Sequence, residues 1–185
     1  MRIIAGEARS RVIDAPKGRD TRPTLDRVRE NLFNIISRHV PEARVLDLYA
    51  GSGALSLEAL SRGAREAVLV DRDREAHRVE KANAERLGYT DRARILLTDD
   101  RSACALLARE GRRFDLIFLD PPYAMRDLRA VTEALLPLMA DVALVIAEHQ
   151  AGVPYTVCGA LVPADERRWG YAGVTFYRQK EAEAP

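Results

Sequence analysis

Hydrophobic residues gather along this chain in five short runs with few polar residues among them. The runs cover residues 45–49, 67–71, 94–98, 114–119 and 142–147. Such runs are typical of strands that are buried on both faces of a parallel sheet. Between the runs, apolar residues recur with helical spacing, as in 25–36 and 128–138. The pattern therefore predicts strands and helices in alternation.

Repeated alternation of strand and helix predicts an α/β fold, with right-handed crossovers and a doubly wound, mostly parallel sheet that carries helices on both faces. Ligands of such sheets bind at the carboxyl ends of the strands. The end of the chain differs, because residues 153–158 and 174–178 resemble strands and no helical period separates them. We expect these two segments to form a terminal antiparallel hairpin at the sheet edge, which makes seven strands.

The N-terminal segment has a different character from the alternating region. Residues 2–20 hold short strand-like pieces interrupted by Gly6, Pro16 and Gly18, which predicts an extended or hairpin arm. We therefore divide the chain into an arm at residues 1–22, a single domain at 23–180 and a frayed polar tail at 181–185.

Composition and charge narrow the class of protein. The 185 residues are 47% hydrophobic and 31% charged with a net charge of +1, which excludes a disordered polyelectrolyte and a globally basic protein. Residues 1–44, however, hold 10 basic and 6 acidic side chains, so positive charge is concentrated near the N-terminus.

Cysteine usage and hydropathy indicate the compartment. The 2 cysteines lack the spacing of a zinc site or a disulfide framework, and the 3 histidines are scattered, so we expect no metal. The longest apolar run, 142–147, is far shorter than the roughly 20 residues of a membrane span. These features predict a cytoplasmic protein that does not enter a membrane.

The first candidate site is a glycine turn after the first predicted strand, in the sequence VLDLYAGSG at 45–53. Glycine there lets the backbone approach a ligand, and amides at a helix start suit polar or anionic groups. As a dinucleotide fingerprint the turn is incomplete, because Ser56 takes the place of the third glycine. Asp71 ends the next strand and can accept both hydroxyls of a ribose. The pattern supports an adenosine-containing cofactor, NAD or S-adenosylmethionine.

The second candidate site is the sequence Asp-Pro-Pro-Tyr at 120–123, at the end of the fourth predicted strand. Two prolines stiffen the backbone, remove two amide donors and are expected to leave carbonyls pointing outward as acceptors. Asp120 adds a carboxylate and Tyr123 an aromatic face. This set suits a planar heterocycle with an exocyclic amino group, which favours S-adenosylmethionine over NAD.

The two motifs together resemble class I S-adenosylmethionine-dependent methyltransferases that modify exocyclic amino groups of nucleic-acid bases. Further segments resemble the RsmD family of bacterial 16S ribosomal RNA guanine-N2 methyltransferases, over residues 1 to about 177. They are MRIIAG at 1–6, TRPT at 21–24, RENLFN at 29–34 and EALSRGA at 58–64. The resemblance implies a Rossmann-like methyltransferase fold.

The resemblance also implies roles for individual residues. Those expected to contact the cofactor are Asp47, Tyr49, Gly51, Ser52, Gly53, Asp71 and Asp99. Asp47 and the glycine turn would line its methionine part, Asp71 its ribose, and either Asp99 or the neighbouring Asp100 its adenine. Tyr49 stands where the family usually has phenylalanine. Asp120, Pro121 and Tyr123 would hold the target guanine, with Asp120 acting as hydrogen-bond acceptor or as base.

The expected partner is 16S ribosomal RNA, which the resemblance places in an assembling small subunit, with the protein acting as a monomer. A paired guanine must leave its stack to reach Tyr123. Basic residues of the arm and the following helix can position the RNA through its phosphates, namely Arg2, Arg9, Arg11, Lys17, Arg22 and Arg29.

Two other functions fit parts of the pattern. An adenine-N6 or cytosine-N4 methyltransferase would also use Asp-Pro-Pro-Tyr, because this motif requires only an exocyclic amine. The other is a noncatalytic RNA-binding or ribosome assembly factor that retains the S-adenosylmethionine-binding fold, and the intact Asp47, Asp71, Asp120 and Tyr123 argue against it.

Overall fold

The computed structural model describes residues 1–17, 23–122 and 124–180, and the positions of elements along the chain confirm the predicted α/β alternation. The helices are α1 (Pro23–Ile35), α2 (Ala54–Ser61), α3 (Arg74–Leu87), α4 (Asp100–Arg109) and α5 (Arg129–Leu135), with short 3-10 turns η1 (Ser37–His39) and η2 (Leu136–Leu138). The strands are β1 (Arg44–Asp47), β2 (Glu66–Asp71), β3 (Ala93–Leu97), β4 (Phe114–Leu119), β5 (Met139–Gln150), β6 (Leu161–Trp169) and β7 (Ala172–Gln179).

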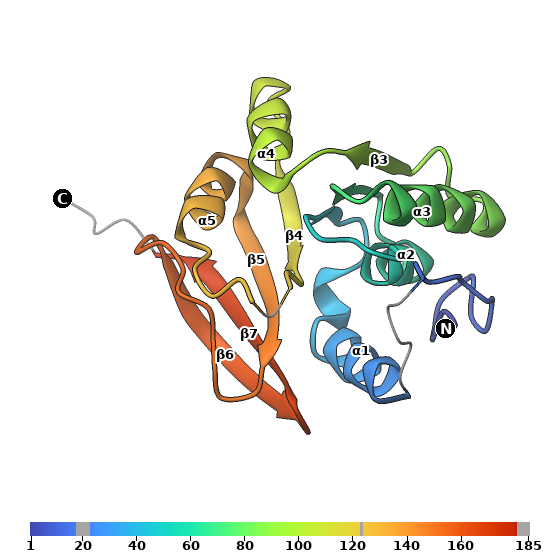
Figure 1. The fold of residues 1–185 in the computed structure, drawn as a ribbon, viewed down its shortest axis with the longest axis horizontal. Helices are drawn as coiled ribbons and strands as arrows, with labels where there is room; N and C mark the ends of the chain where they lie inside the picture. The colour runs from blue at the N-terminus through green and yellow to red at the C-terminus, as the bar shows by residue number, and fades with distance from the viewer. Residues whose placement is uncertain (18–22, 123, 181–185) are drawn as a thin grey trace.

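One seven-stranded sheet organises the molecule, in the order β3-β2-β1-β4-β5-β7-β6 (Figure 1). The pairs from β3 to β5 are parallel, whereas β7 pairs antiparallel with β5 and with β6. The chain runs outward from β1 to β3 and then returns to β4 on the other side of β1. This reversal places the carboxyl ends of β1 and β4 side by side, where doubly wound sheets bind ligands.

Alternation along each central strand divides the apolar side chains between two cores. Val45 packs with α1, α2 and the N-terminal arm, whereas its neighbour Leu46 packs with α4 and α5 on the other face. Both side chains are completely buried, which explains why the sequence of this strand is apolar throughout. Among the described helices, none combines the length and apolar character needed to span a bilayer.

The terminal hairpin is confirmed, but the position of its first strand was wrong. That strand is β6, Leu161–Trp169, instead of residues 153–158. The apolar segment 153–158 makes only an isolated bridge, between Thr156 and Asp127, and Tyr155 is buried against the second core. The true strand is an edge strand with mostly exposed charged side chains, so it has no buried apolar pattern.

Residues 1–17 form a small hairpin-like arm packed against α2 and α3, joined by a bridge between Arg2 and Val12 (Figure 1). Ile3 and Ile13 are each 1% exposed and belong to the first core. The fully buried carboxylate of Glu58 accepts hydrogen bonds from the amides of Ile4 (2.7 Å) and Ala5 (3.0 Å). The arm is therefore an integral part of one core.

Removing the Glu58 carboxylate is expected to destabilise the protein and loosen the arm. Glu58→Ala leaves two buried amides without their acceptor and leaves the nearby guanidinium groups without their buried counter-charge. We expect a loss of about 3–5 kcal/mol in the free energy of unfolding. Urea denaturation measures the loss, and hydrogen exchange at Ile4 and Ala5 reports the arm. The control is Glu85→Ala, at an exposed position on α3. Equal stability of the two variants would contradict this role of Glu58.

Candidate active site

Two adjoining cavities open at the carboxyl ends of the central strands. One has a volume of about 140 Å³ and reaches toward the arm, and the other, of about 710 Å³, lies between β2, α4 and β4. Tyr49, Asp120 and Glu148 line both cavities. An elongated ligand can therefore extend from one into the other past these three side chains.

The glycine turn between β1 and α2 forms part of the wall. Gly51 and Gly53 have φ of 58° and 77°, a left-handed conformation that other residues rarely adopt. A Cβ at Gly53 would lie 2.8 Å from Leu69 Cδ2, so a side chain there would have to displace Leu69 as well as adopt a strained backbone. The Asp71 carboxylate accepts hydrogen bonds from the amides of Gly51 (3.0 Å) and Asp73 (2.9 Å). Asp71 therefore fixes the turn while also lining the larger cavity.

Asp47 ends β1 and lies under the smaller cavity with 1% of its surface exposed. Its Oδ2 accepts a hydrogen bond from the Ser56 hydroxyl (3.1 Å), whereas Oδ1 has no hydrogen-bond partner among the described residues. Burial raises the pKa of Asp47 to about 7, opposed by the Ser56 hydroxyl and assisted by the charge of Asp120. An oxygen in this position is suited to a cationic donor.

Tyr49 closes one side of the larger cavity by linking the glycine turn to α4. Its hydroxyl donates to Asp100 Oδ2 at 2.5 Å, and burial together with this bond raises the pKa of the phenol. Asp99 caps α4 by accepting from the Ser102 amide (2.9 Å), which lowers the pKa of its carboxyl. Both Asp99 and Asp100 line the cavity, so either carboxylate can face a ligand.

The end of β4 brings Asp120 to both cavities and Pro121 to the larger one, as their motif predicts. One expectation was wrong, because the proline carbonyls are already used inside the protein. The Pro121 carbonyl accepts from the buried Tyr155 hydroxyl (3.3 Å), and that of Pro122 accepts from the Met125 amide (2.8 Å). Each carbonyl keeps a second lone pair. Tyr123 lies outside the described residues.

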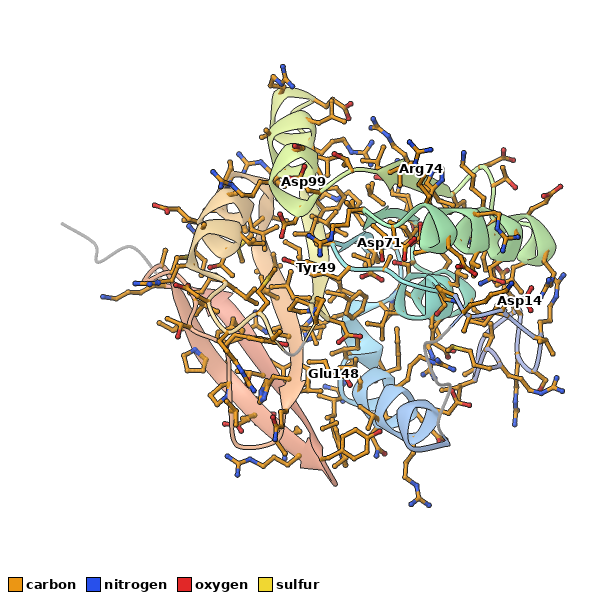
Figure 2. All side chains as sticks on the ribbon, viewed as in Figure 1. Asp14, Tyr49, Asp71, Arg74, Asp99 and Glu148 are labelled. Carbon is orange, nitrogen blue, oxygen red and sulfur yellow. The ribbon has the colours of Figure 1, made fainter. Side chains whose placement is uncertain are left out.

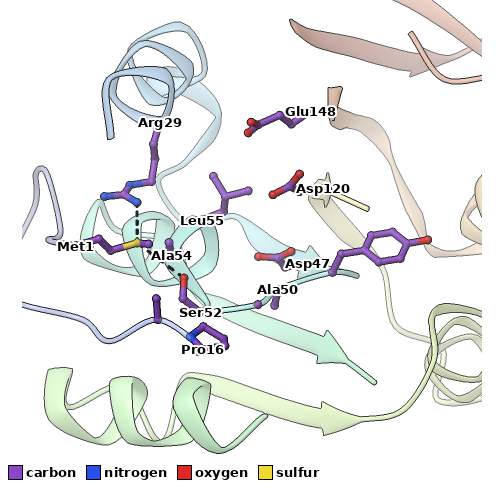
Figure 3. Close-up of a pocket in the computed structure, with 13 residues that line it drawn as sticks. Met1, Pro16, Arg29, Asp47, Ala50, Ser52, Ala54, Leu55, Asp120 and Glu148 are labelled. Carbon is purple, nitrogen blue, oxygen red and sulfur yellow. Dashed lines mark hydrogen bonds between the residues drawn. The ribbon is translucent and has the colours of Figure 1, made fainter. Parts of the chain in front are cut away.

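Glu148, on β5, completes the acidic wall of the smaller cavity, where it lies near Asp120 and Asp47 (Figure 3). Burial and the negative charge of Asp120 raise the pKa of Glu148 to about 8, so its carboxyl is mainly protonated at pH 7. In the sequence Glu148 directly follows the apolar run 142–147, a position that is equally consistent with a ligand contact and with a helix or loop charge.

Two further residues near the site carried no signal in the sequence. Tyr155, which holds the Pro121 carbonyl, packs edge-on against His149 with ring centroids 6.0 Å apart. His149 is fully buried and is fixed by the Thr175 hydroxyl (2.8 Å) and by the Gln150 carbonyl (2.9 Å). The contact could not be foreseen, because Tyr155 is 34 positions from Pro121 in the chain.

The expected phosphate contacts fall into distinct groups. Side chains of Arg2, Arg9 and Lys17 are exposed. Arg11 is also exposed, but its guanidinium donates to the Leu87 (3.2 Å) and Arg86 carbonyls at the end of α3. Arg22 lies outside the described residues. Figure 2 shows the side chains in place on the ribbon.

The structure does not place Arg29 on the surface, where its expected contact with RNA would lie. Its side chain is 5% exposed and lines the smaller cavity next to the glycine turn. This burial argues against a contact between the guanidinium and phosphates on the protein surface. No group of three or more His, Cys, Asp or Glu in residues 1–17, 23–122 and 124–180 is placed to hold a metal ion.

Comparison with known proteins decides the family. The model of the family described as conserved hypothetical protein 95 matches residues 1–178. The chain is also 38% identical over 191 residues to ribosomal RNA small subunit methyltransferase D of Escherichia coli, covering 100% of this chain and 91% of that protein. The chain belongs to the RsmD family. Membership of the RsmD family confirms the resemblance drawn from the motifs.

Solved structures agree with this assignment to the RsmD family. A hypothetical protein of Thermus thermophilus superimposes with a TM-score of 0.81 at 34% identity, covering 95% of this chain and 98% of that chain. A SAM-dependent methyltransferase from Agrobacterium tumefaciens has the same fold, with a TM-score of 0.61 at 16% identity over 86% of this chain and 63% of that chain. The expected Rossmann-like methyltransferase fold is confirmed.

The raised pKa of Asp47 predicts a pH-dependent stability. Because its folded pKa of about 7 exceeds its ordinary value of 3.8, the carboxyl contributes stability that is fully present below pH 3.8 and is lost as pH rises through 7. Asp47→Asn keeps the shape without the charge. We expect its Tm to match wild type near about pH 3, where the carboxyl is protonated in both the folded and the unfolded protein. At pH 8 its Tm should exceed that of wild type by roughly 3–6 °C, measured by scanning fluorimetry.

The control for this experiment is Asp99→Asn, which should shift Tm in the opposite direction. Helix capping lowers the pKa of Asp99, so its charge stabilises the fold above the ordinary pKa and this stability is lost as pH falls. An Asp47→Asn variant that is less stable than wild type at pH 8 would show that the buried carboxylate does not destabilise the fold.

Proposed function

We propose that this protein transfers a methyl group from S-adenosylmethionine to the exocyclic N2 of a guanine in 16S ribosomal RNA. One observation carries the proposal: an acid-lined cavity beside the glycine turn adjoins a second cavity that is lined by Asp120 and Pro121 at the end of β4. Membership of the RsmD family and the name of the Escherichia coli relative support RNA as the substrate.

The described residues fit the cofactor along the two cavities. Asp71 would accept the ribose hydroxyls, Asp99 or Asp100 the adenine amino group, and the turn Gly51-Ser52-Gly53 with Asp47 would hold the methionine part. When bound, S-adenosylmethionine supplies a methyl group activated by a positive sulfonium. The carboxylate of Asp47 favours a positive charge in this cavity.

The target amine would bind where Asp120 and Pro121 meet the cofactor. The exocyclic N2 of guanine is a poor nucleophile, because its lone pair is delocalised into the ring. The site therefore contributes mainly the alignment of N2 with the methyl carbon and the sulfur, which can lower the barrier by about 7–11 kcal/mol. As N2 gains positive charge, Asp120 and the second lone pair of the Pro121 carbonyl become stronger acceptors for its hydrogens. Asp120 acts there as acceptor or as base, and Tyr123 would stack on the unpaired guanine.

The surrounding groups prepare these acceptors. A protonated Glu148 leaves the negative charge of the site with Asp120, because two adjacent carboxylates resist simultaneous ionisation. The Tyr155 hydroxyl fixes the direction of the Pro121 carbonyl. Residues 1–22, as an RNA-binding arm, would hold the phosphates of the substrate, which we take to be an assembling small subunit bound by one monomer.

Substitution of Asp120 tests the reaction. Asp120→Ala is expected to reduce methyl transfer by roughly 10²–10³-fold, because the acceptor for the amine is lost, while the Kd for S-adenosylmethionine in calorimetry changes little. Transfer is measured with radiolabelled cofactor on 16S RNA and on small-subunit particles.

Digestion of the wild-type product to nucleosides identifies the base. N2-methylguanosine supports the proposal, whereas N6-methyladenosine or N4-methylcytidine supports the alternative methyltransferases. Cofactor binding without transfer to any RNA substrate would instead favour a noncatalytic assembly factor, and loss of cofactor binding together with transfer in Asp120→Ala would assign this residue to folding.

Charge substitutions test the arm without disturbing its core residues. Arg9→Gln and Lys17→Gln together should weaken RNA binding at low salt and lower the slope of log K against log salt by about 2, one for each lost phosphate contact. Filter binding at several salt concentrations measures this slope. The matched control is Arg109→Gln at the exposed end of α4. An unchanged slope in the double variant would remove the arm from the RNA interface.

A further inference from the structure

Two of the three nitrogens in the guanidinium of Arg29, Nη1 and Nε, have no hydrogen-bonded oxygen among the described residues. Nη2 donates to the Arg2 carbonyl (2.6 Å) and to Asp26 Oδ1 (3.1 Å), and Nε lies 3.9 Å from Glu58 Oε2. Nη1 instead contacts the sulfur of Met1 at 3.2 Å. A thioether is a weak acceptor, whereas a guanidinium binds carboxylates best.

A second donor converges on the same sulfur. The Ser52 hydroxyl, from the glycine turn, lies 3.8 Å from Met1 Sδ, so Arg29 and Ser52 approach one point from opposite sides (Figure 3). Met1, Arg29 and Ser52 all line the smaller cavity. Two donors around a weakly bound and flexible side chain form a position that an anionic group can occupy when the thioether moves aside.

The rest of this cavity is unfavourable to an anion. Asp47, Asp120 and Glu148 line it, and Arg29 is the only basic side chain among its described lining residues. A ligand with separate positive and negative groups satisfies both parts of the cavity. Its cation would meet the unpartnered Oδ1 of Asp47, and its anion would meet Arg29.

We propose that Arg29, with Ser52, binds the carboxylate of the amino-acid part of S-adenosylmethionine, while Asp47 binds its ammonium group. This inference rests on the cofactor of the proposed function and assigns Arg29 to cofactor selection. It also accounts for the burial of Arg29, since a charge taken out of water is retained where it meets a charged ligand.

The experiment compares two ligands without RNA. Calorimetry measures the Kd of S-adenosylmethionine and of its decarboxylated form, which keeps the ammonium and sulfonium groups. Wild type should bind S-adenosylmethionine at least about 10-fold more tightly, although the acidic cavity favours the more positive decarboxylated ligand. Arg29→Met should weaken S-adenosylmethionine by about 10–100-fold and the decarboxylated form by no more than about threefold.

The matched control is Arg62→Met. Arg62 also contacts Glu58, with Nε 2.7 Å from Oε1, but it does not line the cavity. This variant should leave the ratio of the two Kd values unchanged. In Ser52→Ala the ratio should fall by less than in Arg29→Met, and this variant, together with the wild-type ratio, decides the question if Arg29→Met does not fold.

Three results would overturn the assignment: a wild-type protein that does not distinguish the ligands, an Arg29→Met variant that weakens both equally, or a ratio unchanged in Ser52→Ala when that variant is the test. Different results would overturn the proposed function. A protein that distinguishes the ligands but methylates no RNA keeps the carboxylate site, and one that methylates guanine without distinguishing them loses only this site. Binding of neither ligand would overturn the proposed cofactor itself.

Discussion

The buried carboxylate of Glu58 is the interaction on which the arrangement of the site depends. It binds the backbone amides of the arm at Ile4 and Ala5 and the guanidinium of Arg62, and it lies 3.9 Å from that of Arg29. A buried carboxylate requires such partners, since an uncompensated charge in the interior costs several kcal/mol. One side chain of α2, the helix that follows the glycine turn, therefore joins this helix to the arm and to α1.

Electrostatic repulsion within the site is the second constraint. The carboxyl groups of Asp47, Asp120 and Glu148 face one small cavity, and burial raises the pKa values of Asp47 to about 7 and of Glu148 to about 8. These groups reduce their repulsion by holding protons or by meeting a positive ligand. A sulfonium and an ammonium group are cations of this kind, so the same constraint that weakens the fold locally favours the proposed cofactor.

The edge of the sheet shows where sequence patterns fail. The apolar composition of residues 153–158 favours a strand, but this segment packs Tyr155 into the second core and under the end of β4. The real strand β6 pairs only with β7 and exposes most of its charged side chains to water. Pairing by backbone hydrogen bonds needs no apolar alternation when neither face is deeply buried, so hydropathy carries little information about an edge strand.

The central strands, the glycine turn and the acids at the strand ends were determined by the sequence itself, because burial on both faces requires apolar runs and left-handed backbone requires glycine. The motifs also determined the family. Tertiary structure alone decided that Arg29 of α1 lines the cavity, that Glu148 joins Asp120, and that Tyr155 holds the Pro121 carbonyl. These contacts join residues far apart in the chain, and their geometry depends on how helices and strands pack, which no local pattern of residues records.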